Sequence, residues 1–210
     1  MFDKIYYINL DKRQDRKRHI EENVKRPLLG HFPEELWQRM SAVDKTAETS
    51  RSKRSAGCSL THLAAWKDAE KNGYESFLII EDDFRLKITP ELFYSHVQEL
   101  YNDFPNFNLC NIAYNNLRKL NKIKNTNFYK SWNIQTTCGY IAKTSFTKKM
   151  QPTIEHSVAQ LNLNSSYDIW AIDQVWKKFQ NDPNWILMER AGIQLDSYSD
   201  IEKGDVKYGV

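Results

Sequence analysis

Cysteine is scarce in this chain, with only Cys58, Cys110 and Cys138 among 210 residues. The absence of a C-x-x-C pair and the odd count argue against a disulfide framework and indicate a reducing compartment. The first residues include an acid and lack the apolar stretch of a signal peptide. No apolar run approaches the roughly 20 residues that are needed to cross a bilayer. We therefore expect a cytoplasmic protein without a transmembrane segment.

Glycine and proline are also few, at 7 and 6 residues, and no stretch rich in them divides the chain. No internal repeat is visible either, so we expect one domain over residues 1–210, which is long enough to bury a substantial core. The net charge of +3 is too small to indicate a nucleic-acid partner by itself.

Short apolar runs typical of strands alternate with segments typical of helices. The expected strands cover residues 4–9, 36–43, 77–81, 107–114, 137–142 and 185–188. The expected helices cover 12–25, 59–72 (capped by Ser59), 90–104, 145–151 and 169–180, with loops over 45–55 and 115–130 and an irregular tail after Gly192. This alternation predicts an α/β fold.

The strongest chemical signal is the apolar run 77–80, which leads directly into Glu81, Asp82 and Asp83. Carboxylates crowded at a strand end repel one another unless a cation lies among them. Because ligands of open α/β sheets bind outside the carboxyl ends of the strands, the run predicts a divalent metal and a phosphate-bearing ligand. The alternative is structural: Glu81 or Asp83 caps the next helix or pairs with Lys87.

A second polar cluster follows the first expected strand. Arg13 and Arg16 lie on adjacent turns of the expected helix, and guanidinium groups recognise phosphate through two parallel hydrogen bonds. Asn9 and Asp11 are suited to hydrogen-bond a base or a ribose. The alternative is a solvated helix face on which Asp15 pairs with its neighbours.

The segment 51–62 carries a basic run into small residues and an expected helix start. Helix N-termini attract anions, and Gly57 would let the backbone approach a ligand closely. His62 is either a ligand contact or a buried, satisfied histidine. Cys58 suits a small core position better than the role of a nucleophile.

Two acids near the expected last helix are candidate general bases. Asp168 stands at the helix start and is either a base or an N-cap. Asp173 lies five residues further, so on a regular helix the two would point about 140° apart. A single regular helix could not direct both into one pocket.

Together these segments resemble glycosyltransferase family 25, which includes bacterial lipooligosaccharide glycosyltransferases and collagen hydroxylysine galactosyltransferases. The resemblance spans residues 4 to about 175 and is carried, in the order of the family, by 7–11 with Arg13 and Arg16, 57–66, 77–85 and 139–142. The loop 115–130 shows no family pattern, which leaves the acceptor open.

The resemblance implies a GT-A-like fold with a mixed central sheet flanked by helices, a nucleotide-sugar donor and a divalent metal, Mn²⁺ or Mg²⁺. Asp83 would be the metal ligand, Glu81 would face the ribose, and Asp82 would support the turn or coordinate through water. Inversion at the anomeric carbon needs a base, for which Asp168 matches the family best and Asp173 is second.

The implied activity is metal-dependent transfer of a hexose, galactose or glucose, from a UDP-sugar to a glycan or a hydroxylysine-type hydroxyl, as in lipopolysaccharide biosynthesis. One alternative is a degenerate module of the same fold that binds a sugar or a partner without chemistry. Another is an RNA-binding domain that uses the basic residues and aromatics, although acids are interspersed throughout and no RNP-like motif occurs. The oligomeric state cannot be inferred from these patterns.

Overall fold

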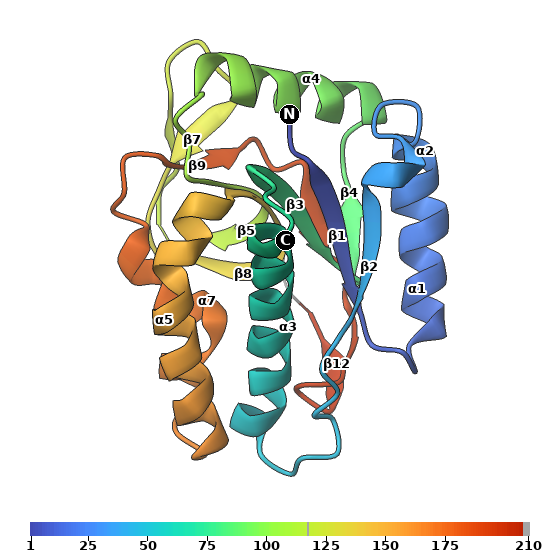
Figure 1. The fold of residues 1–210 in the computed structure, drawn as a ribbon, viewed down its shortest axis with the longest axis vertical. Helices are drawn as coiled ribbons and strands as arrows, with labels where there is room; N and C mark the ends of the chain where they lie inside the picture. The colour runs from blue at the N-terminus through green and yellow to red at the C-terminus, as the bar shows by residue number, and fades with distance from the viewer. Residues whose placement is uncertain (117, 208–210) are drawn as a thin grey trace.

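A computed structural model describes residues 1–116 and 118–207, so Leu117 of the expected loop and the last three residues of the expected domain lie outside the described residues. Its centre is an eight-stranded mixed sheet in the order β2-β1-β3-β8-β5-β9-β7-β6. Helices cover the sheet, with α3 and α5 side by side in front of it and α4 crossing one end (Figure 1). The predicted α/β class and mixed central sheet are confirmed.

The strands of the sheet are β1 (Lys4–Asn9), β2 (Trp37–Ser41), β3 (Ser76–Glu81), β5 (Leu109–Asn116), β6 (Asn121–Lys122), β7 (Phe128–Lys130), β8 (Ile134–Lys143) and β9 (Trp185–Met188). β1 pairs in parallel with both β2 and β3, whereas β8 runs antiparallel between β3 and β5. All six strands expected from the sequence are present, within a few residues of their predicted bounds. The parallel strands β1 and β3 therefore end at the same edge of the sheet.

The central strands are buried on both faces because alternate side chains enter two separate cores. On β3, Leu78 and Ile80 pack in the core beneath α1, α2 and α4, while Phe77 and Ile79 pack beneath α3 and α5. The helical segments are α1 (Gln14–Ile20), η1 (Glu21–Lys25), α2 (Arg26–Leu28), η2 (Glu34–Leu36), α3 (Arg51–Lys71), α4 (Pro90–Asp103), α5 (Thr144–Asn162), α6 (Tyr167–Trp170), α7 (Ile172–Val175) and η3 (Trp176–Phe179). No helix among them is both long and apolar enough to cross a membrane.

Several helix bounds differ from the prediction. The hydroxyl of Ser50, not that of Ser59, caps α3 by accepting a hydrogen bond from the backbone N–H of Lys53, so half of the expected loop 45–55 is helical. The chain also stays helical through Pro27. Proline removes a backbone N–H from a helix, and here the turn before it is the π-helical segment η1, which departs from the regular α-helical hydrogen bonds.

The last third of the chain contains the largest differences. α5 is far longer than the predicted helix 145–151 and contains Pro152. The predicted helix 169–180 is interrupted at Ala171, whose ψ of 148° is extended. The tail expected to be irregular forms β10 (Gly192–Gln194), which pairs with β4 (Phe84–Leu86), and a hairpin of β11 (Ser197–Ser199) and β12 (Gly204–Val206). The pairing of β10 with β4 joins segments that are distant along the chain, and local sequence does not encode it.

Gly57 lies inside α3 and lets that helix approach the segment after β2. A Cβ at this position would lie 2.5 Å from the carbonyl oxygen of Val43. We expect Gly57→Ala to lower the free energy of unfolding by roughly 1–3 kcal/mol, because backbone must move to accept the methyl group. Gly30→Ala is the matched control, since nothing lies within 4 Å of its Cβ position. Equal melting temperatures for the two variants would contradict this account.

Candidate active site

The acidic residues and the first polar cluster meet at one edge of the sheet. Because Ile8 of β1 pairs with Glu81 of β3, Asn9 and the residues 81–83 follow neighbouring parallel strands at the same end. A cavity opens beyond this edge and is lined by residues from β1, the segment after β2, α3, the acidic triplet and the C-terminal segment 194–201. The site therefore lies where ligands of open α/β sheets bind.

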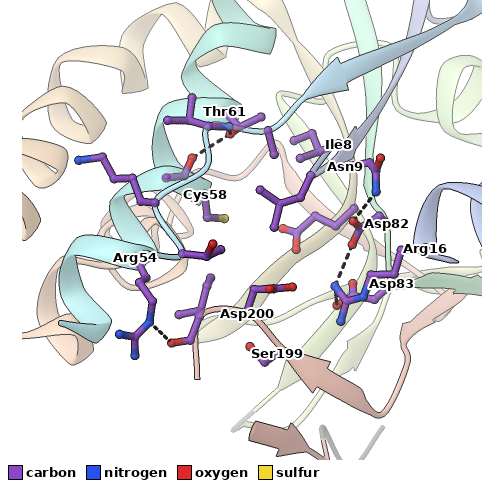
Figure 2. A pocket seen from close by; sticks show the side chains of 18 of the residues that line it. Ile8, Asn9, Arg16, Arg54, Cys58, Thr61, Asp82, Asp83, Ser199 and Asp200 are labelled. Carbon is purple, nitrogen blue, oxygen red and sulfur yellow. Dashed lines mark hydrogen bonds and ion pairs between the residues drawn. The ribbon is translucent and has the colours of Figure 1, made fainter. Parts of the chain in front are cut away.

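Arg16 is the guanidinium that contacts the acidic residues. Its Nη1 lies 2.8 Å from Oδ1 of Asp82 and 3.4 Å from Oδ2 of Asp83. The amide nitrogen of Asn9 donates to the other oxygen of Asp82 at 2.8 Å. Figure 2 shows this group on one wall of the cavity, with Cys58 and Arg54 across from it. Asp82 is thus held on both oxygens, which is consistent with support of the turn.

Asp83 carries the least compensated charge of the three acids. Burial raises its pKa, and the nearby charge of Glu81 raises it further, to about 7 in spite of Arg16. Its side chain accepts a hydrogen bond from Nε2 of Gln194 at 3.1 Å, and the thiol of Cys138 lies 3.6 Å from its other oxygen. One guanidinium does not balance the carboxylates gathered here, so the cavity wall attracts a further cation.

Glu81 lies between this cavity and a second one. Burial raises its pKa, but hydrogen bonds from His62 and Thr137 outweigh that effect and lower it overall. His62 Nε2 lies 3.1 Å from Oε1 of Glu81, and its ring is fully buried. His62 does not line either cavity, so the structure places it behind Glu81.

The remaining predicted donor-binding residues take different places. Asn9 and Gly57 line the first cavity, as does Arg16. Asp11 and Arg13 do not line it. The side chain of Asp11 is 72% exposed and pairs with Arg39 at 2.5 Å, while Arg13 pairs with Asp200 at 2.6 Å.

The C-terminal segment completes the site. From the sequence, residues 198–201 resemble a tail of some family members that either closes over the donor or packs on the sheet, and in the structure Ser199, Asp200 and Ile201 line the cavity. Arg16 Nη2 donates to the carbonyl of Tyr198 at 2.8 Å, and Arg54 Nε donates to the carbonyl of Ile201 at 2.6 Å. Gln194 reaches Asp83 because β10 pairs with β4, directly after the triplet. Arg54 could have been found, since it lies in the basic run 51–54, whereas no pattern marks Gln194.

The second cavity adjoins the first and contains one of the two candidate bases. The two cavities share Cys58, Glu81, Gln194, Ser199 and Ile201 as lining residues. Asp173 lines the second cavity and accepts from the backbone N–H of Thr136 at 3.2 Å. Burial raises the pKa of Asp173. Asp168 lies outside both cavities, with its side chain 82% exposed and 3.7 Å from Arg51.

Comparison with solved structures shows the fold. A mannose-1-phosphate geranyltransferase from Thermus thermophilus superposes with a TM-score of 0.52 at 10% identity, over 94% of this chain and 75% of that one. A glycosyltransferase involved in glycosylation of the major capsid of PBCV-1 gives 0.53 at 13% identity, over 95% of both chains. The chain therefore has a GT-A-like fold, which it shares with these two proteins.

Comparison with sequences shows the family. No curated protein matched the chain. The profile described as glycosyltransferase family 25 (LPS biosynthesis protein) matches residues 31–171, which is more than half of the chain and contains the acidic triplet. With the GT-A architecture and a carboxylate-lined cavity at the strand ends, this match means that the chain belongs to glycosyltransferase family 25 and is a transferase.

Proposed function

We propose that this protein is a metal-dependent, inverting hexosyltransferase that uses a UDP-sugar donor and a hydroxyl acceptor. The observation that carries the proposal is Asp83, a buried carboxylate whose pKa is raised to about 7 at the wall of a cavity. Burial and the neighbouring carboxylates of Glu81 and Asp82 both disfavour its ionised form, and a bound cation would offset both effects. The family description points to a glycan acceptor of the lipopolysaccharide type.

The residues at the triplet fit Mn²⁺ or Mg²⁺. Both ions prefer carboxylate and phosphate oxygens, and the negative charge at Asp83 and Glu81 exceeds the positive charge that Arg16 supplies. Asp83 would hold the ion, with Asp82 fixed beside it by Asn9 and Arg16. A bound divalent ion supplies charge neutralisation for the leaving diphosphate.

The donor would occupy the first cavity. Ile8, Leu10 and Val43 provide apolar surface there, which suits the faces of a pyrimidine ring. Arg16 and Arg54 lie on opposite walls, and with Lys45 they are lining side chains suited to phosphate oxygens. Glu81 is suited to accept from a ribose hydroxyl. Asn9 acts through Asp82 and Gly57 through the close packing of α3, so both support this cavity.

The acceptor hydroxyl would enter the second cavity, where Asp173 is the general base. Burial raises the pKa of Asp173, which makes its carboxylate a stronger base and so better able to remove a proton from the acceptor hydroxyl. The interruption of the helix at Ala171 directs Asp173 inward and leaves Asp168 at the surface, paired with Arg51. We therefore assign the base to Asp173 and a surface ion pair to Asp168.

The proposal is tested with a panel of UDP-hexoses, measuring UDP release with an excess of EDTA or with added Mn²⁺ or Mg²⁺. We expect release from UDP-galactose or UDP-glucose only with a divalent ion. Full release in EDTA would contradict the metal requirement. Tight UDP binding by calorimetry without release from any donor or acceptor would instead support a binding module.

A further inference from the structure

Behind the acidic triplet, a buried chain of hydrogen bonds runs from α3 across β8 to Glu81. Nε1 of Trp66 donates to Oη of Tyr140 at 2.8 Å, and the same Oη lies 2.8 Å from Nδ1 of His62. Nε2 of His62 then lies 3.1 Å from Oε1 of Glu81. The hydroxyl of Thr137 donates to that same oxygen at 2.5 Å.

The chemistry of the groups fixes the direction of the two outer bonds in this chain, from Trp66 to Tyr140 and from His62 to Glu81. An indole N–H only donates, so Tyr140 accepts from Trp66 and its own hydroxyl proton is free to point to His62. An ionised carboxylate only accepts, so Nε2 of His62 carries the proton that faces Glu81, and in the neutral ring Nδ1 then accepts from Tyr140. With the His62 ring neutral, each bond in the chain points toward the carboxylate.

The chain is rigid because its members are core residues. Trp66, His62 and Tyr140 each have 0% exposure. The ring of His62 stacks on that of Tyr140 at 5.7 Å between centroids, and Trp176 packs edge-on against Tyr140 at 5.6 Å. Their rotamers are thus set by the packing of α3 and η3 on the sheet.

Both bonds to Glu81 use Oε1, and neither uses Oε2. The Glu81 side chain is 19% exposed and lines both cavities. We propose that His62, Tyr140 and Trp66 are positioning residues that lock Oε1 of Glu81 and thereby present Oε2 to the donor. The inference rests on the proposed function, in which Glu81 accepts a hydrogen bond from a donor hydroxyl.

A pre-oriented carboxylate binds more tightly than a free one because the ligand does not have to immobilise a flexible side chain. The role of His62 is then indirect: it lacks direct access to the donor and acts through Glu81. The same holds for Tyr140 of β8, which lines neither cavity and whose hydroxyl contacts His62 and Trp66 of α3.

The test is Tyr140→Phe, which removes one hydroxyl and keeps the ring. We expect the Kd for UDP in the presence of Mn²⁺, measured by calorimetry, to rise about tenfold, as is typical when an outer partner of a ligating group is lost. KM for the donor should rise with it, and kcat should change little. The matched control is Tyr6→Phe: Tyr6 is equally buried in the same core, and its hydroxyl donates to Asp68 at 2.7 Å, away from the cavities.

A double-mutant cycle with Glu81→Ala separates positioning from general loss of structure. If Tyr140 acts through Glu81, adding Tyr140→Phe to Glu81→Ala causes no further loss of UDP affinity. A further loss as large as that in the single variant would overturn the inference. If Tyr140→Phe fails to fold, Thr137→Val removes the other bond to Oε1 and is expected to weaken UDP binding in the same Glu81-dependent way.

Different results would contradict the positioning role of Tyr140 and the donor contact of Glu81. Unchanged affinity in Tyr140→Phe and Thr137→Val, with weaker binding in Glu81→Ala, overturns the positioning role and leaves the donor site intact. Unchanged affinity in Glu81→Ala removes Glu81 from the donor site, and the positioning role with it.

Discussion

Asp83→Asn is expected to lower kcat/KM for sugar transfer by roughly 10³-fold, because the amide is neutral and a poor ligand for a divalent ion. The variant keeps an oxygen to accept from Gln194, so the local hydrogen bond survives. The measurement is UDP release at saturating Mn²⁺. Asp103→Asn on α4, exposed and outside both cavities, is the control and should retain full activity. Full Mn²⁺-dependent turnover in Asp83→Asn would refute the metal assignment.

Asp83→Asn should be more stable than the wild type although it is less active. The pKa of Asp83 is raised to about 7 from an unfolded value of 3.8, so the folded state favours the protonated acid. The ionised group therefore costs stability, and this cost grows as the pH rises from about 4 to 7. Without metal, Asp83→Asn should melt at a higher temperature than the wild type at a pH of about 8, and the difference should shrink near pH 5. A lower melting temperature for the variant in the alkaline buffer would show that the carboxylate stabilises the fold.

Asp173→Asn is expected to reduce kcat by about 10²–10⁴-fold, the usual contribution of a general base, while the affinity for UDP stays unchanged. We expect kcat to fall without a change in UDP affinity because Asp173 lines the second cavity and not the first. Asp168→Asn is the matched control: it changes an exposed aspartate on α6, the segment just before α7, and we expect nearly wild-type kcat. The reverse pattern, with loss in Asp168→Asn alone, would return the base to Asp168.

The pH profile gives an independent check on Asp173. Burial raises its pKa, so its ionised, proton-accepting form is lost at a higher pH than for an exposed aspartate. Transfer by the wild type should therefore fall as the pH is lowered through this raised value. In Asp173→Asn, at a saturating Mn²⁺ concentration that keeps Asp83 ionised, the residual activity should not fall over that pH range. If the activity of both enzymes falls over the same acidic pH range, the group that titrates there is not Asp173.

Much of the site was predictable because it depends on short, local patterns. The apolar run 77–80 predicted a buried strand, and the acids that follow it necessarily lie at its carboxyl end. Arg16 was identified by its place after the first strand, and the parallel pairing of β1 and β3 puts it beside Asp82 and Asp83. For these residues, their position directly after a predicted strand was sufficient to predict that they lie at the site.

Other features depend on contacts between distant segments, which no local pattern contains. The cap at Ser50, well before the expected Ser59, was missed because a basic, polar stretch reads as a loop. Gln194 contacts Asp83 only because β10 pairs with β4. The predicted geometry of Asp168 and Asp173 assumed one regular helix, and the extended backbone of Ala171 separates them instead.

The amino-acid sequence by itself determined the α/β class, the family and the acid cluster at a strand end, because these follow from periodicity and from motifs within a few residues. Only the tertiary structure decided that Asp173, and not Asp168, faces a cavity. It also decided that His62 contacts Glu81 and that the C-terminal segment packs against Arg16 at the first cavity. The physical reason is that burial, charge compensation and hydrogen-bond direction are set by the neighbours in space. For this site those neighbours come from β1, α3, β3, β8 and the C-terminal strands.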